Sequence, residues 1–257
     1  MTLAKFRVPA VAVTIGAAAL ALPLLSLAVP AQAAAGGNVG GRGLVSARTG
    51  APSVVINNRT FAGYQATVAA GSATSSAAQF KVPRLSCTSA LRAITPVAGV
   101  VVNNFNSYSS TFVFTGCSRG KAVFFPALVI NGNEVNYTTT SFHPGNVIKV
   151  STKVTTRGTT VQVTDVTTGV TKRRTGPGAN SVAAYVGDSN WRLSNGTLLG
   201  VPSFGTLTFT SCLVDGRALG RSHPLQIERM NNRGIVQIAT GALSPGGIAF
   251  HTYYRHF

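Results

Sequence analysis

The stretch that decides the fold is residues 147–174, which read VIKVSTKVTTRGTTVQVTDVTTGVTKRR. It contains three short runs rich in valine and threonine, at residues 147–155, 160–166 and 170–174. Arg157-Gly158 separates the first two runs, and Thr168-Gly169 is a turn signal before the third. Runs of β-branched residues bounded by glycine turns are typical of strands joined as hairpins. We therefore predict antiparallel strands over this stretch.

The same pattern of short β-type runs separated by turn residues extends from about residue 54 to the end of the chain. Runs of Thr, Val, Ser, Phe and Tyr are separated by Gly, Asn and Pro at intervals of about ten residues. Residues 206–213 alternate strictly, with Leu207, Phe209, Ser211 and Leu213 on one side and three threonines and Cys212 on the other. Because no sustained helical repeat and no fixed period occurs, we predict a single all-β domain, a sandwich or barrel, over residues 54–257.

The N-terminus has the pattern of a secretory signal peptide. Lys5 and Arg7 precede an apolar run over residues 8–29, and Ala31-Gln32-Ala33 provides a small-residue cleavage site. The alternative is a retained membrane anchor, since the run is long enough to span a bilayer. Two prolines in the run and its small-residue end favour removal. We predict a signal peptide over residues 1–33 and no stable membrane anchor after cleavage.

Residues 34–53 are rich in Gly and Ala without periodicity, which indicates a flexible leader. The alanine-rich style of the signal peptide is typical of bacteria. We therefore expect a protein that is secreted or held in the extracytoplasmic cell envelope.

The chain is strongly basic, with 22 Lys and Arg against 5 Asp and Glu. Without Lys5 and Arg7, the net charge of the remaining chain is about +15. Such a field suits anionic polymers of a cell envelope, acidic lipid surfaces or nucleic acid. The basic residues are nevertheless spread over the whole length, and the one run, residues 172–174, has no interleaved aromatics. We therefore expect no specific nucleic-acid partner.

Three cysteines, Cys87, Cys117 and Cys212, leave an odd one in an oxidising compartment. Cys87 follows a Val-Pro strand end and Cys117 follows the next strand pattern, so we predict that these two form a disulfide. Spacing alone does not fix the connectivity. Cys212 is expected to be buried and free in a strand, because free cysteine behaves as a small hydrophobe. No metal-ligand spacing and no sign of a cofactor are present.

Six segments follow one another in an informative order. They are residues 60–64 (TFAGY), 78–83 (AQFKVP), 110–113 (STFV), 143–148 (HPGNVI), 164–169 (TDVTTG) and 201–210 (VPSFGTLTFT). Individually these are common strand phrases, but in this order they resemble the glutamic peptidases, or eqolisins, over about residues 57–257. The resemblance implies a concanavalin-A-like sandwich of two curved antiparallel sheets.

The family's chemistry, by resemblance, uses a glutamate as general base for water and a glutamine that positions the water and stabilises the oxyanion. Here Ala184 stands for the glutamate and Phe125 for the glutamine, and Gly116 falls near an aspartate of the family pattern. No polar side chain occurs over residues 122–130 that could replace the glutamine. We therefore expect no catalytic residue, and a former groove lined by Phe125, Ala184, Tyr185 and Phe112.

Five carboxylates could replace the missing base: Glu134, Asp165, Asp188, Asp215 and Glu228. Asp188 lies on the strand face of Ala184 but about 13 Å along it. Asp165 and Asp215 sit in turn signatures, and Glu134 follows an Asn-Gly hairpin, so none is a good general base by position.

Three functions remain open. The leading hypothesis is a non-catalytic binding or envelope protein whose groove or basic surface takes a peptide, a glycan or an anionic envelope polymer. The alternatives are an acid endopeptidase with a displaced catalytic pair, and a polymer binder that acts by charge alone.

Overall fold

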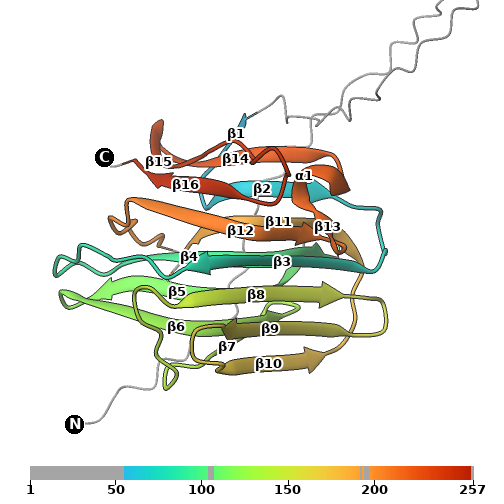
Figure 1. Ribbon diagram of the computed structural model, residues 1–257, viewed down its shortest axis with the longest axis horizontal. Coiled ribbons are helices and arrows are strands. Elements are labelled where there is room, and N and C mark those ends of the chain that lie inside the picture. The colour runs from blue at the N-terminus through green and yellow to red at the C-terminus, as the bar shows by residue number, and fades with distance from the viewer. Residues whose placement is uncertain (1–54, 104–106, 192, 194–196, 256–257) are drawn as a thin grey trace, which may run out of the picture. The chain divides into compact units, whose positions relative to one another are not determined.

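The computed structural model describes residues 55–103, 107–191, 193 and 197–255 (Figure 1). The predicted signal peptide and leader, residues 1–53, lie outside this range. All the described residues belong to one compact unit. Nothing helical among them has the length and hydropathy needed to cross a bilayer.

The described residues form sixteen strands and one short helix, α1 (Leu219–Ser222). The strands are β1 (Val55–Asn58), β2 (Phe61–Thr67), β3 (Thr74–Lys81), β4 (Arg92–Val102), β5 (Ser107–Ser118), β6 (Lys121–Ile130), β7 (Asn133–Asn136), β8 (Val147–Val154), β9 (Thr159–Asp165), β10 (Thr171–Gly176), β11 (Ser181–Asn190), β12 (Thr206–Val214), β13 (Arg217–Ala218), β14 (Leu225–Asn232), β15 (Ile235–Thr240) and β16 (Phe250–Tyr254). The predicted all-β class is confirmed.

The hairpins predicted over residues 147–174 are confirmed as β8, β9 and β10, paired in sequence order and antiparallel. The turn between β9 and β10 has a local cause. The Asp165 Oδ1 accepts the backbone N–H of Thr167 at 2.9 Å, and Gly169 adopts a φ of 78°, which a glycine tolerates without a Cβ clash. The aspartate at this position therefore serves the turn.

The strands follow one hydrogen-bonded path, β10-β9-β8-β3-β12-β16-β15-β14-β2-β11-β4-β5-β6-β7. Pairing is antiparallel except between β1 and β14. The two ends of the path pack face to face, with β3, β8 and β9 in front of β11, β4, β5 and β6 in Figure 1. The hydrogen bonds thus join the strands into one continuous sheet whose two ends form two packed layers.

A large apolar core fills the space between the two layers, with side chains such as Phe80, Phe209, Ile148 and Val186. Buried hydroxyls connect the layers where the side chains are small. Ser76 Oγ donates to the carbonyl of Tyr185 at 2.9 Å, and Thr152 Oγ1 donates to the carbonyl of Ala98 at 2.9 Å. Each such bond contributes about 1 kcal/mol net and satisfies a buried hydroxyl. They fix how closely the layers approach.

The strict alternation expected along residues 206–213 is wrong at Ser211. The register of β12 against β3 shifts between Thr210 and Leu213, and Ser211 has a φ of 48°. This bulge inserts one residue and turns Cys212 into the core, while Leu213 is only half-buried.

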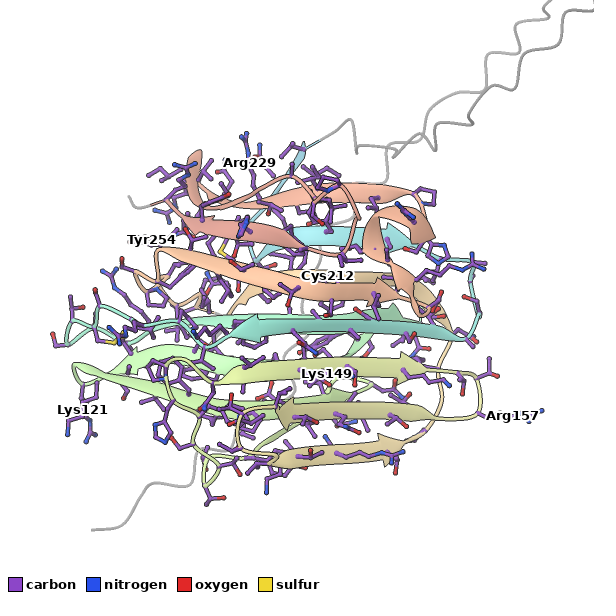
Figure 2. The ribbon with its side chains drawn as sticks, in the orientation of Figure 1. Lys121, Lys149, Arg157, Cys212, Arg229 and Tyr254 are labelled. Carbon is purple, nitrogen blue, oxygen red and sulfur yellow. A yellow bond between two sulfur atoms is a disulfide. The ribbon has the colours of Figure 1, made fainter. Side chains whose placement is uncertain are left out.

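The predicted disulfide is confirmed between Cys87 and Cys117, whose Cα atoms are 5.4 Å apart. It ties the segment after β3 to the end of β5. Cys212 is free and buried on β12, as expected (Figure 2). Burial raises the pKa of its thiol, so the sulfur remains protonated and unreactive.

Candidate ligand-binding face

Neighbouring residues of β11 point to opposite sides of the sheet. Ala184 is fully buried in the core between the layers, together with Val186. Tyr185 lies on the other side, in a separate cluster with Phe112 and Phe61. Side chains of a strand alternate with a period of two, so Ala184 and Tyr185 cannot line the same groove. The structure therefore brings together three of the four expected groove residues, Phe112, Phe125 and Tyr185, and leaves out Ala184.

We call this side of β2, β11, β4, β5 and β6 the aromatic face. It carries Phe61, Phe112, Phe114, Phe125, Tyr185 and Trp191. The ring of Phe125 stacks on Phe114 with 4.7 Å between centroids and an interplanar angle of 8°. Trp191 meets Phe112 and Phe114 edge-on, at 5.7 and 5.1 Å. These are the offset and T-shaped arrangements that aromatic pairs favour.

Glycines make room for these rings. A Cβ on Gly99 would lie 2.3 Å from the ring carbon Cζ of Tyr185, which pairs directly with Gly99 across β4 and β11. On β5, a Cβ on Gly116 would meet the Phe114 ring at 2.6 Å and the carbonyl of Arg92 at 2.7 Å. An aspartate, which the family pattern has near Gly116, has no space here unless these neighbours move.

The aromatic face also holds a carboxylate that the sequence argument rejected. Glu134 on β7 pairs with Val129, and Asn136 pairs with Ala127, so both lie on the side of the sheet that these two apolar residues share. The side-chain amide of Asn136 donates to Glu134 Oε1 at 2.6 Å. Burial raises the pKa of Glu134 above its usual value, and the hydrogen bond from Asn136 partly opposes that shift.

The Asn-Gly turn at residues 131–132 could have revealed this placement. It is a two-residue hairpin loop, which sets Asn133 opposite Ile130 and therefore Glu134 opposite Val129. Two tyrosines lie in the same neighbourhood. Burial, and after it the charge of Glu134, raises the pKa of Tyr108, and burial also raises the pKa of Tyr185.

Three other carboxylates, Asp165, Asp188 and Asp215, lie away from the aromatic face. Asp188 is fully buried in the inter-layer core, where its Oδ2 accepts the hydroxyl of Thr252 and its Oδ1 has no partner. Burial raises its pKa to about 7. Glu228 on β14 is buried against Asn58, and burial raises its pKa as well.

Asp165 and Asp215 serve turns, as the sequence indicated. Asp215 Oδ1 accepts the backbone N–H of Ser75 at 2.7 Å, and its Oδ2 lies 3.1 Å from His223. Within the described part of the chain, no three His, Cys, Asp or Glu residues group in a way that could hold a metal ion.

The described residues thus form an all-β fold with an aromatic face, one disulfide and a run of sequential hairpins. The profile of the Peptidase A4 family matches residues 59–240, and the chain belongs to this family. A search of curated protein sequences found no match.

Solved structures of glutamic peptidases share the fold. Scytalido-glutamic peptidase with a transition-state analogue inhibitor is 16% identical, with a TM-score of 0.62, over 77% of this chain and 98% of that one. SCP-B, an eqolisin in complex with the tripeptide Ala-Ile-His, is 15% identical, with a TM-score of 0.57, over 76% and 100%. Aspergilloglutamic peptidase from Aspergillus niger is 16% identical, with a TM-score of 0.52, over 64% and 99%.

Proposed function

We propose that the protein is a secreted, non-catalytic member of the Peptidase A4 family that binds a ligand at the cell envelope. One observation carries the proposal. By the resemblance, Phe125, which stacks on Phe114, stands for the family's glutamine, and the segment of Ala183, Ala184 and Tyr185 stands where the family has its glutamate. None of these side chains can take a proton from water at a peptidase's working pH or donate an amide to an oxyanion.

The aromatic face supports a binding role. Its rings offer an apolar surface, and its tyrosine and tryptophan add polar groups at the ring edge. Peptides and glycans bind to surfaces of this kind. SCP-B has been seen with a tripeptide bound, which makes a peptide the first ligand to test. In our proposal the fold is the family's two-layered, concanavalin-A-like sandwich, and the aromatic face is the former substrate groove.

An acid peptidase assay tests the absence of catalysis. The purified protein is incubated with a denatured protein substrate between pH 2 and 5, with aspergilloglutamic peptidase as the active control. We expect no peptide products above a buffer blank. Cleavage that increases with enzyme concentration would overturn the proposal.

A second candidate function is an acid endopeptidase with a displaced pair, Glu134 and Asn136. The 2.6 Å amide–carboxylate contact on the aromatic face favours it, because a carboxylate and an amide are the two groups that the family's reaction needs. Two features make it the weaker candidate. The raised pKa of Glu134 keeps it protonated in acid, where a base must be ionised, and the Asn136 amide already donates to the carboxylate.

The variant Glu134→Gln separates the two candidates if any cleavage is found. It keeps the shape of the side chain and removes its proton affinity. Cleavage abolished by Glu134→Gln but retained in Asp165→Asn, a turn residue outside the face, would establish the displaced pair. Cleavage retained in both would exclude it.

A further inference from the structure

The outer surface of the front layer is basic. Along β8, Lys149 and Lys153 are exposed, while Ile148, Val150 and Val154 between and beside them face the core. Register places further cations on the same side, because residues directly opposite on paired strands share a face. Arg173 on β10 pairs with Gln162, which pairs with Ser151. Lys81 lies two residues after Gln79, which pairs with Lys149.

We call these four cations, Lys81, Lys149, Lys153 and Arg173, the basic face. Figure 2 labels Lys149 on the front of β8, in the middle of this surface. All four are exposed. Within the described residues, the single ion pair is that of His223 with Asp215, so none of the four cations is neutralised.

Uncharged polar side chains fill the spaces between the cations. Across the outer side of β3, β8, β9 and β10 lie Ser75, Gln79, Ser151, Thr160, Gln162, Thr164, Thr171 and Thr175. The outward positions of these strands carry neither an acidic nor an aromatic residue. Asp165 pairs with Ile148 at the end of β9 but is buried on the core side, and Asp215 lies beside Ser75 at the far end of β3 from Lys81.

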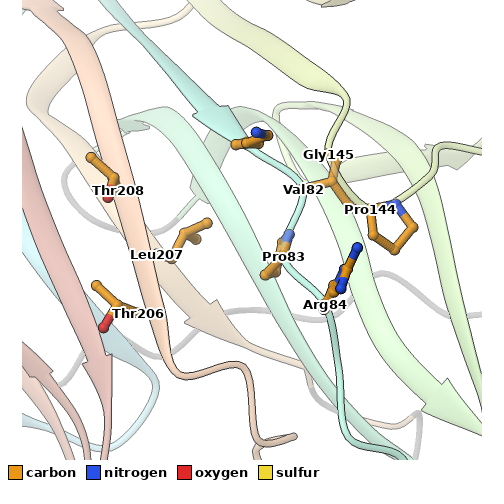
Figure 3. A pocket seen from close by; sticks show the side chains of 9 residues that line it. Val82, Pro83, Arg84, Pro144, Gly145, Thr206, Leu207 and Thr208 are labelled. Atoms are coloured by element: carbon orange, nitrogen blue, oxygen red, sulfur yellow. The ribbon is translucent and has the colours of Figure 1, made fainter.

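A hollow adjoins the basic face where β3 and β12 separate (Figure 3). It has a volume of about 460 Å³. Its wall includes Lys81 and Arg84 on one side and Thr206 and Thr208 of β12 on the other, with Pro144 and Gly145 beside them. Two cations and two hydroxyls around one concavity suit a single phosphate or carboxylate, because both kinds of donor bond to anionic oxygens.

We propose that the basic face and its hollow bind a linear polymer that carries one negative charge on each repeat. This rests on the proposed function as an envelope-binding protein, and it names the ligand. Lys149 and Lys153 are four residues apart on β8, about 13 Å along the strand, so an extended chain reaches both. The absence of aromatic side chains at the outward positions disfavours single-stranded nucleic acid and neutral glycans, which depend on stacking.

The test compares two variants of the full chain, produced by secretion from a bacterial host, that lose the same charge. One removes three cations of the basic face, Lys149→Gln, Lys153→Gln and Arg173→Gln. The control removes three exposed cations elsewhere, Arg59→Gln, Arg119→Gln and Lys121→Gln. Binding is measured by calorimetry in 50 mM salt, and a third variant, Lys81→Gln with Arg84→Gln, tests the hollow.

Three polymers serve as probes. Poly(glycerol phosphate) supplies phosphodiesters, polygalacturonate supplies carboxylates, and dextran is the neutral control. We expect at least one acidic polymer to bind with an affinity that falls as salt is added, and dextran not to bind. The face variant should weaken binding at least about tenfold and the control variant less than about threefold, since contact charges act locally.

Equal weakening by the face and control variants would overturn the proposal, because binding would then follow net charge alone. The proposal also fails if neither acidic polymer binds. The peptidase assay does not depend on either of these results. Peptide cleavage would contradict the proposed function, whereas the binding results test only this inference, so the two failures are distinguishable.

Discussion

Ala184 and Tyr185 are adjacent in the chain, but they belong to different environments. Tyr185 contacts Phe61 on the aromatic face, with 5.6 Å between ring centroids. Ala184 packs in the core between the layers and has no exposed surface. A side chain introduced at position 184 therefore enters the core and does not reach the aromatic face.

The variant Ala184→Glu is expected to destabilise the protein without creating peptidase activity. Burying a carboxylate without a partner costs several kcal/mol, so the free energy of unfolding should fall by at least about 3 kcal/mol. Urea unfolding measures the change. Ala90→Glu, on an exposed loop, is the matched control and should change stability little. Native-like stability together with acid cleavage in Ala184→Glu would contradict this placement.

Asp188 makes the stability depend on pH. Burial raises its pKa from 3.8 to about 7 in the folded chain, so the folded state holds the proton more tightly than the unfolded state. The stabilisation of the folded state by the raised pKa of Asp188 is fully present below about pH 4 and is lost as the pH rises through about 7. Three pKa units correspond to roughly 4 kcal/mol as an upper bound.

We expect the free energy of unfolding to decrease between pH 4 and 8, and the decrease to be smaller in Asp188→Asn. Glu134 and Glu228 act in the same direction, because burial raises their pKa values too. Urea unfolding across this pH range gives both slopes. An identical slope in the variant would show that Asp188 does not hold its proton in the core.

At the scale of elements, β4 and β11 depend on a glycine–tyrosine pair. The Tyr185 ring occupies the space above Gly99. Gly99→Ala should force this ring to move and cost about 1 to 3 kcal/mol, the usual effect of overpacking. The cost should be smaller in a Tyr185→Leu background, measured by a double-mutant cycle in urea.

Gly246→Ala is the control for this cycle, because the added Cβ would have its nearest neighbour at 3.8 Å. Equal costs of Gly99→Ala with and without the tyrosine ring would mean that the two residues do not meet.

The disulfide acts on the whole molecule. Cys87 and Cys117 enclose a separation of 30 residues, and a loop of this length gives about 3 to 4 kcal/mol in the chain-entropy description. The double variant Cys87→Ala with Cys117→Ala should lose that much stability in urea unfolding.

In the intact protein, Cys212 should react with a thiol reagent only after unfolding. Rapid labelling under native conditions would place Cys212 at the surface.

Charge is also a property of the whole molecule. Three of the five acids, Glu134, Asp188 and Glu228, have raised pKa values, and the other two serve turns, so few ionised acids offset the basic residues at the surface. Cations remain exposed, and on the outer side of β3, β8, β9 and β10 the outward positions carry no acidic residue.

The sequence by itself determined the all-β class, the hairpins over residues 147–174 and the order of segments that marks the family. Each depends on local signals, namely β-branched runs, glycine turns and motif order, that do not need the fold around them. The free, buried Cys212 was predicted for the same kind of reason, its apolar character.

Only the tertiary structure decided which side chains meet. It moved Ala184 to the core, brought Glu134 and Asn136 onto the aromatic face, and inserted the bulge at Ser211. Each of these depends on strand register, and a shift of one residue reverses the face that every side chain of a strand occupies. The register of the β6–β7 hairpin follows from its Asn-Gly turn, but elsewhere register is set by pairing between segments far apart in the chain, which a single sequence does not display.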